Sequence, residues 1–349
     1  MDMSLASDGG GSGGPEIASA RSTSAIRYGA VAIGRNEGQR LVRCLKSLSD
    51  ADTVVYVDSG STDHSAEAAR QLGATVVELD LSIPFTAARA RNAGFARLRQ
   101  LAGDLDYVQF VDGDCELAAG WAEAAVALLA QRGDIASVCG VLREREPERS
   151  IYNWLCDKEW NGPVGEIHSC AGNVMHRASA LQSVGGYRND VIAAEEDELC
   201  VRLRAANWRI WRLPCTMAVH DAAMTHFSQW WKRSLRAGYA FAQGAALHGA
   251  KPERHFVWES RRALLWGLML PLACVVSIAA LGPFALLALL VYPLQILRLT
   301  GSGSGAIADR ASIALFQVIG RFPESLGVMR YERDRFFRRN PTIIEHKQS

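Results

Sequence analysis

The chain has 349 residues, of which 49% are hydrophobic and 21% charged, and its 38 basic and 37 acidic side chains give a formal net charge of +1. A chain of this length can bury a sizeable core, whereas its near-zero charge argues against nucleic-acid binding driven by net charge. The eight cysteines include no C-x-x-C pair, which argues against a disulfide framework or a structural zinc site and favours a reducing compartment.

The N-terminal segment 1–27 is rich in Gly and Ser and predicts a disordered tail. It lacks a basic start followed by an apolar stretch, so we expect no secretory signal. The part that follows is therefore expected to stay in the cytoplasm.

Short runs rich in Val and Ile alternate with segments of helical spacing between residues 30 and 138. The apolar runs lie at 31–33, 53–58, 75–79 and 107–112, and the helical patterns at 41–48, 65–72 and 86–101. This alternation predicts an α/β fold with βαβ units and a mostly parallel sheet. Such sheets bind ligands beyond the carboxyl ends of their strands, which is where Asp58 and Asp112 fall.

Residues 263–297 form a run of 35 positions without Asp, Glu, Lys, Arg or His. About 20 apolar residues span a bilayer, so the run predicts a membrane segment over 263–299. Gly282-Pro283 divides it into 19 and 14 residues, which favours a transmembrane helical hairpin over the alternative of one kinked span. Arg261-Arg262 and Arg298 flank the run and predict that both ends face the cytoplasm.

The segment 300–349 predicts an amphipathic, basic tail. From residue 298 onwards the chain holds nine basic and five acidic side chains, and its apolar residues cluster as SIALFQVIG. This combination suits a helix on an anionic membrane surface, with a solvated basic tail as the alternative. The α/β domain is expected to occupy residues 28–250.

Asp112-Gly113-Asp114 ends the apolar strand YVQFV. Hard divalent cations bind carboxylates together with substrate phosphates, so the pair predicts a metal and diphosphate site, although D-G-D is also common in turns. Asp58 ends an earlier strand and precedes the polar turn SGSTD, where its carboxylate could accept hydrogen bonds from a base or a ribose.

Four adjacent acids, Glu195 to Glu198, precede an amphipathic helical pattern. Acidic residues in a first helical turn stabilise the helix, but four exceed that need. Crowded carboxylates raise one another's pKa, which suits a general base that takes a proton from a sugar hydroxyl.

Taken in order, these segments resemble glycosyltransferase family 2, the inverting nucleotide-sugar transferases with a GT-A fold, and in particular its membrane-anchored bacterial members. The resemblance covers residues 28–245. It is carried by VAIGRNEGQRLVRCLKSL at 31–48, VVYVDSGSTDHS at 54–65, ARARNAG at 88–94, FVDGDCEL at 110–117 and EEDELCVRLRAANWRIWRLP at 195–214.

The resemblance implies roles for residues near the strand ends. It places Asn36 and Glu37 in the nucleotide-binding first loop and Asp58 against the base. It identifies Asp112, Gly113 and Asp114 as the DxD motif, which in that family binds Mn²⁺ or Mg²⁺ and the diphosphate of the donor, a UDP-, GDP- or dTDP-sugar.

The family's Glu-Asp pair, which carries the catalytic base, falls on Glu195-Glu196 when the later Leu199 and Arg202 are aligned. The second acid here is Glu instead of Asp, so Glu196 is the expected base and Asp197 its rival.

Three further residues are candidates near this site. Arg89 and Arg91 are expected to support the nucleotide, since guanidinium groups pair with phosphates, unless they only solvate a helix face. His220 follows a strand-like segment and is a candidate third metal ligand, although a lone His is more often structural.

The run QWWKR at 229–233 departs from the Q-x-x-R-W pattern of processive relatives, so a polymerase is not expected. Trp230 and Trp231 are instead candidates for anchors near the bilayer surface. The expected function is transfer of one sugar to a hydroxyl of a glycan or lipid-linked acceptor, at the cytoplasmic face of the inner membrane and in contact with its lipids. The alternatives are a polyprenyl-phosphate sugar synthase, whose acceptor is a lipid phosphate, and a catalytically degenerate membrane scaffold.

Overall fold

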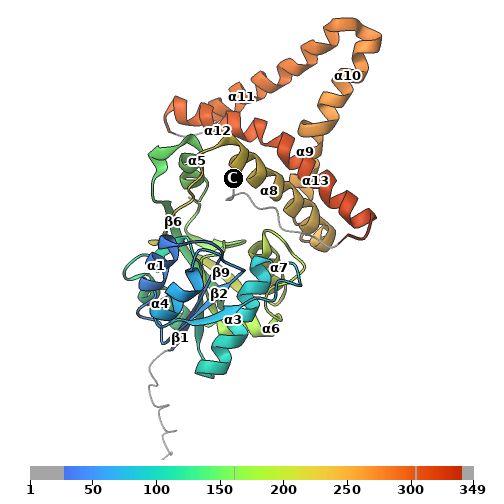
Figure 1. Ribbon diagram of the computed structural model, residues 1–349. Coiled ribbons are helices and arrows are strands. Elements are labelled where there is room, and N and C mark those ends of the chain that lie inside the picture. Colours follow the sequence, from blue (N-terminus) through green and yellow to red (C-terminus); the bar gives the residue numbers. More distant parts are fainter. Residues whose placement is uncertain (1–26, 161, 303–304, 340–349) are drawn as a thin grey trace, which may run out of the picture.

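The computed structural model describes residues 27–160, 162–302 and 305–339. The predicted N-terminal tail lies outside these ranges, except for its last residue, and so do parts of the predicted C-terminal tail. An α/β domain is followed by a group of long helices, which lies against one end of it in Figure 1.

Nine strands form one sheet in the order β3-β2-β1-β4-β8-β6-β9-β5, with β7 paired to β9. The strands are β1 (Tyr28–Gly34), β2 (Thr53–Asp58), β3 (Thr75–Glu78), β4 (Tyr107–Asp112), β5 (Cys115–Leu117), β6 (Ile135–Glu144), β7 (Gly165–Ile167), β8 (Val174–Arg177) and β9 (Arg209–His220).

The prediction of a mostly parallel sheet is right for β3, β2, β1 and β4, which pair in parallel, and again for the pair β6 and β9. Beyond β4 the sheet is mixed, because β8 runs antiparallel to both β4 and β6. The chain enters β8 from a loop at the edge where β4 ends, without a crossover helix, and therefore runs back along it. The α/β class itself is confirmed.

The parallel strands bring their carboxyl ends to one edge. Gly34 pairs with Asp58 across β1 and β2, and Ile33 pairs with Asp112 across β1 and β4. These strands are rich in Val and Ile and buried on both faces, as parallel strands covered by helices are. The polar residues that follow them are thereby collected in one place.

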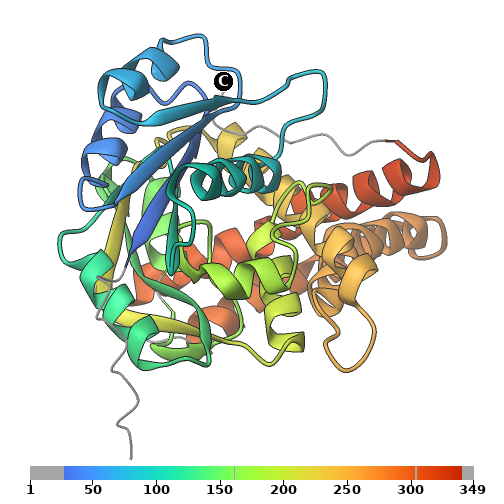
Figure 2. The ribbon, with the colours of Figure 1, turned by 90° about the horizontal axis from the view of Figure 1, so that it is seen from below.

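Helices cover the sheet. In the first half they are α1 (Gln39–Lys46), α2 (Ser65–Gln71), α3 (Ala87–Ala102) and α4 (Trp121–Gln131), followed by the short 3-10 helix η1 (Pro147–Arg149), α5 (Ile151–Glu159), α6 (Ala178–Ser183) and α7 (Glu195–Ala205). Figure 2 shows α3 alongside the sheet. Gly94 lets it approach closely, since a Cβ there would collide with Val31 and Val57 on β1 and β2.

The C-terminal part is helical. It consists of α8 (Phe227–His248), α9 (Val257–Leu264), the π-helical turn η2 (Leu265–Met269), α10 (Leu270–Leu281), the 3-10 segment η3 (Gly282–Leu290), α11 (Val291–Ser302), α12 (Ile307–Ile319) and α13 (Arg321–Phe336). The stretch Val257–Ser302 is one helical run, long and apolar enough to cross a membrane by length and composition alone. Of the 18 consecutive residues in this run that are most apolar, only 11% are buried.

The helical run changes direction around η3, as Figure 1 shows. The Tyr292 hydroxyl on α11 donates to the carbonyl oxygen of Trp266 on η2 (2.6 Å), although 26 residues separate them. Cys274 on α10 likewise donates to the carbonyl oxygen of Ala285 on η3 (3.1 Å). The two arms of the run therefore touch near its base and near its tip.

The helix α13 packs closely against α8, which precedes the apolar run. A Cβ on Gly238 of α8 would collide with the backbone of Glu324, and one on Gly327 of α13 would collide with Leu235. The rings of Tyr239 and Tyr331 meet edge to face with centroids 5.3 Å apart. This contact between segments 90 residues apart was not predicted from the sequence, which indicated only a basic, amphipathic tail.

Candidate active site

A cavity of about 450 Å³ lies where β1 and β4 end. Its walls come from segments far apart in the chain. They include the loop after β1 (Gly34 to Glu37), the turn after β4 (Asp112 to Asp114), the loop before β8 (Ala171, Gly172), the start of α7 (Glu195, Glu196) and the end of β9 (His220). The structure thus places most of the predicted site residues around one space.

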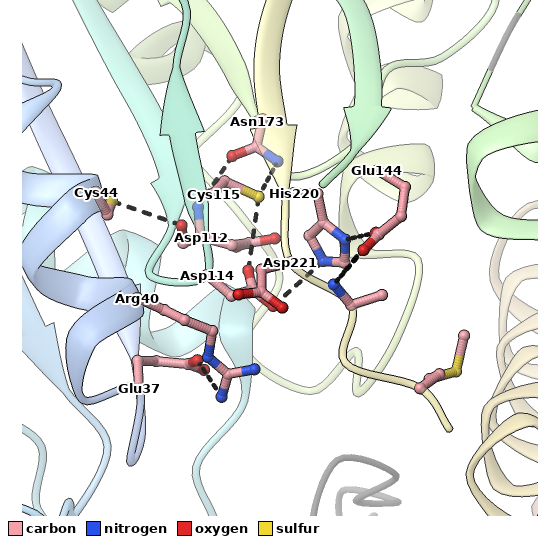
Figure 3. Close-up of polar contacts among 12 residues, drawn as sticks. Glu37, Arg40, Cys44, Asp112, Asp114, Cys115, Glu144, Asn173, His220 and Asp221 are labelled. Carbon is pink, nitrogen blue, oxygen red and sulfur yellow. Dashed lines mark hydrogen bonds and ion pairs between the residues drawn. The ribbon is translucent and has the colours of Figure 1, made fainter. Parts of the chain in front are cut away.

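Asp114 and His220 lie next to each other at the wall of this cavity (Figure 3). The His220 Nε2 lies 3.2 Å from the Asp114 Oδ2. On its other side the His220 Nδ1 lies 3.3 Å from the Oε2 of Glu144, which ends β6 and has no exposed side-chain surface. A carboxylate on the far nitrogen of a histidine fixes the ring and directs the free nitrogen at a metal ion.

The buried Glu144 carboxylate is itself held in place. It accepts hydrogen bonds from the backbone N–H of Ala222 (3.2 and 3.3 Å) and from the side-chain amide of Asn153 (3.3 Å). Trp160 packs edge-on against the His220 ring, with centroids 4.6 Å apart. The imidazole therefore has a fixed orientation towards Asp114.

The donor atoms of Asp114, Cys115 and His220 lie within 4.8 Å of one another. The Cys115 thiol donates to Asp114 (3.5 Å), and burial raises its pKa well above the usual value. Burial thus disfavours the thiolate form that a metal ligand needs. The carboxylate of Asp114 and the imidazole of His220 remain, together with Asp112 at the cavity wall, and this set of oxygen and nitrogen donors fits Mn²⁺ or Mg²⁺.

Arg91 on α3 lies at the centre of three carboxylates. Its guanidinium is 2.6 Å from both Glu195 and Glu196 and 2.8 Å from the Asp112 Oδ1, and its side chain is only 2% exposed. Burial alone would lower the pKa of Arg91, but the three carboxylates together raise it well above its usual value. Arg91 thus links the turn Asp112-Gly113-Asp114 to the start of α7, and its contact with a nucleotide stays a prediction.

Glu196 is buried beside this arginine. Burial raises the pKa of its carboxyl group to about 8, against the opposing effect of Arg91 and with support from Glu195 and Asp112. A carboxylate whose pKa is near neutral is suited to accept a proton. Its rival Asp197 lines a different, adjoining cavity, and burial raises its pKa as well.

Two glycines leave room for this arrangement. A Cβ on Gly172 would collide with Arg91 and lie 3.0 Å from Asp112 and 3.1 Å from Glu196. A Cβ on Gly113 would lie 3.1 Å from the carbonyl oxygen of Ile33. Both turns must therefore lack side chains for the acidic groups to meet.

Asn36 and Glu37 also line the cavity. Asn36 has a positive φ of 56°, and its side-chain oxygen accepts the backbone N–H of Thr62 (2.7 Å), which ties the first loop to the turn after β2. Glu37 pairs with Arg40 at 2.8 Å. These contacts fix the conformation of the first loop at the cavity wall.

Asp58 and Arg89 are not among the lining residues. The Asp58 carboxylate accepts hydrogen bonds from the N–H groups of Gly60 (3.0 Å) and Ser61 (2.8 Å) and from the Tyr56 hydroxyl (2.9 Å). Arg89 donates to carbonyl oxygens of the loop before α3, including that of Ile83 (2.7 Å). Each side chain orders a loop, and a direct contact with a nucleotide stays a prediction for both.

Three residues of the site were missed in the sequence. Glu144 ends a strand in the run REREPER, and no local pattern distinguishes it from its exposed neighbours. Gly172 and Asn173 were not singled out, yet Asn173 accepts the backbone N–H of Asp112 (3.0 Å). A buried acid at a strand end is the one signal that could have indicated Glu144.

Comparisons with known proteins show what the chain is similar to. Residues 31–175 match the family model described as glycosyl transferase family 2. The chain is 29% identical over 232 residues to the pre-mycofactocin glycosyltransferase of Mycobacterium tuberculosis, covering 61% of this chain and 46% of that protein. It thus spans about half the length of the curated relatives it matches.

A solved structure shares the fold over most of the chain. It is the mannosyltransferase PcManGT from Pyrobaculum calidifontis in complex with GDP-Man and Mn²⁺, with a TM-score of 0.57, 20% identity, and coverage of 89% of this chain and 88% of that one. Residues 31–175 are thus similar to glycosyl transferase family 2, and 61% of the chain is similar to a curated glycosyltransferase. The structural likeness supports the same α/β fold.

Proposed function

We propose that this chain is a membrane-anchored, metal-dependent, inverting glycosyltransferase that moves one sugar from a nucleotide-sugar to an acceptor hydroxyl. The observation that carries the proposal is the single cavity around which Asp112, Asp114, His220 and Glu196 meet. The known glycosyltransferase among the curated relatives supports the reaction class. Donor and acceptor identity are not encoded by these residues, since one fold hosts many specificities.

In the proposed reaction Glu196 takes the proton of the acceptor hydroxyl. The acceptor oxygen then forms a bond to the anomeric carbon, while the bond from that carbon to the donor diphosphate breaks and the diphosphate leaves with the electron pair. Attack opposite to the leaving group inverts the anomeric configuration. A divalent ion at Asp114 and His220 would supply charge neutralisation for the diphosphate, and Arg91 keeps Glu196 and Asp112 in register.

We expect the apolar run to enter the inner membrane as a hairpin, with the α/β domain in the cytoplasm. The contact of α13 with α8 supports this arrangement, because a single span would separate these two helices by the bilayer. Each arm is short, since 19 helical residues reach about 28 Å. Lipid-facing side chains are supplied by the exposed Leu and Val residues of α10 and η3.

The first experiment is thermal unfolding of the detergent-purified chain with UDP, GDP, dTDP or CMP, with and without Mn²⁺ or Mg²⁺. A ligand that binds only the folded state raises the midpoint, so one nucleotide should do so in a metal-dependent way. Asp114→Ala should abolish the effect. No shift with any nucleotide would favour the scaffold, against which the intact acidic cluster argues.

A polyprenyl-phosphate sugar synthase is the second candidate, favoured by the arginines Arg233 and Arg236 at the cavity wall. A phosphate acceptor needs little base catalysis. Near-full activity of Glu196→Gln would therefore favour this alternative over transfer to a hydroxyl.

A further inference from the structure

A second cavity of about 580 Å³ lies between the α/β domain and the C-terminal helices. It adjoins the first cavity, with which it shares four lining residues: Cys156, Ala194, Arg233 and Arg236. Many of its lining residues are carried by α5, α8 and α12. Figure 1 shows these helices where the α/β domain meets the C-terminal helical part. A molecule in the second cavity could thus reach into the first.

The walls of this cavity are aromatic. The Phe316 ring of α12 meets Trp230 of α8 with centroids 5.0 Å apart and Tyr152 of α5 with centroids 5.9 Å apart. Phe256, on the α9 side, and Ile313 of α12 add apolar surface. These two residues lie just before and shortly after the apolar run Val257–Ser302, so the cavity sits at the base of the candidate membrane segment.

Besides Lys158 and Asp197, three arginines and two glutamates line this cavity. Arg233 pairs with Glu159 at 2.8 Å, and Arg321 pairs with Glu324 at 2.6 Å, so these four groups neutralise one another. Across the ranges that the structure describes, Arg236 forms no ion pair, although it is partly buried on α8. It lies where the two cavities join.

A guanidinium without an ion pair, partly shielded from water, favours an anionic ligand, and its planar fork matches a phosphate. Apolar walls beside it at a membrane face match a hydrocarbon chain. We propose that the second cavity binds the lipid part of a lipid-linked acceptor, with its phosphate at Arg236 and its apolar chain between α8 and α12. The inference rests on the proposed transferase function and names the acceptor class and its site.

The test measures thermal unfolding of the full chain in a polyoxyethylene detergent with farnesyl phosphate, farnesol or inorganic phosphate. Farnesyl phosphate should raise the midpoint by a few degrees, and neither of the other two should match it. Arg236→Gln should abolish the shift and Arg236→Lys should retain part of it. Lys232→Gln is the matched control, because Lys232 is an exposed cation on the same helix, and it should keep the full shift.

A second variant tests the apolar part without changing a charge. Gln317 of α12 is exposed and lines the cavity, so the larger side chain of Gln317→Trp should fill part of it. The concentration of farnesyl phosphate needed for the same midpoint shift should then rise at least threefold. Equal shifts with inorganic phosphate would overturn the lipid assignment, and equal shifts with farnesol would overturn the role of Arg236. An unchanged shift in both Arg236→Gln and Gln317→Trp would mean that farnesyl phosphate does not bind in the second cavity.

Nucleotide binding is measured on the unaltered chain in parallel. If a nucleotide with Mn²⁺ raises the midpoint and farnesyl phosphate does not, this inference fails while the transferase function stands. If no nucleotide binds, the proposed function fails by itself.

Discussion

At the scale of single residues, the site depends on groups whose environment changes their chemistry. Glu196 is one of four adjacent acids on α7, yet only Glu195 and Glu196 contact the buried Arg91. Asp197 faces the adjoining cavity and Glu198 pairs with Arg202 at 2.7 Å. The four carboxylates of one helical turn therefore lie in three surroundings: beside Arg91, in the adjoining cavity and beside Arg202. Glu196 is the one expected to act as the base.

We predict that Glu196→Gln lowers turnover by about 100-fold or more, the usual contribution of a general base, while metal-dependent nucleotide binding persists. Asp197→Asn should have a much smaller effect. Steady-state rates with donor and acceptor, together with nucleotide-induced thermal shifts, separate the two roles. A larger loss in Asp197→Asn than in Glu196→Gln would make Asp197 the base.

The pH dependence of kcat/KM follows from the same carboxyl group. A base acts in its deprotonated form, and burial raises the pKa of Glu196 from 4.5 to about 8. Activity should therefore rise with pH, by about tenfold from pH 6 to pH 7, and level off above pH 8. A profile that is flat between pH 6 and pH 8 would contradict the assignment, and Glu196→Gln should lose the rise.

A separate prediction concerns Glu144, which contacts His220 but does not line the first cavity. Glu144→Gln should weaken Mn²⁺ binding by about 10- to 100-fold, as the loss of a carboxylate behind a ligating histidine does. The measurement is the Mn²⁺ concentration needed to stabilise the nucleotide complex. Glu148→Gln, an exposed acid on η1, is the control and should bind Mn²⁺ normally. Equal affinity in both variants would remove His220 from the metal site.

At the scale of elements, the sequence predicted what is local and missed what is not. The strands β1, β2 and β4 and the turn Asp112-Gly113-Asp114 are encoded in short runs, so the edge that carries the site followed from them. The contact of Glu144 with His220 joins positions 76 residues apart, and nothing in either segment predicts the other. The same is true of Arg236, whose importance depends on cavities formed by distant helices.

The contact between α8 and α13 is an element-scale feature that can be tested. Gly238→Ala places a Cβ against the backbone of Glu324, which cannot move aside as a flexible side chain does. We expect a loss of about 1–3 kcal/mol, typical of overpacking, seen as a lower unfolding midpoint. Gly301→Ala on α11 is the control, since a Cβ there meets nothing within 4 Å. Equal midpoints would mean that the two helices do not pack as described.

At the scale of the whole molecule, the helical group does two things at once. Its apolar run presents exposed Leu and Val side chains, while α12 and α13 return the chain to the α/β domain and close the second cavity. The candidate membrane segment and the second cavity are therefore parts of one structure. A chain whose run crossed the bilayer once would carry α13 away from α8 and leave this cavity open.

This argument predicts that both flanks of the run lie on the same side of the membrane. Single cysteines at Phe337, which is 60% exposed beyond α13, and at Ser49, exposed in the α/β domain, should react with an impermeant maleimide from the cytoplasmic side only. The eight native cysteines are replaced beforehand or serve as a background, since seven are buried. Labelling is compared between right-side-out and inverted vesicles. Reaction of the two positions from opposite sides would establish a single span, and the contact of α13 with α8 would then not exist in the membrane.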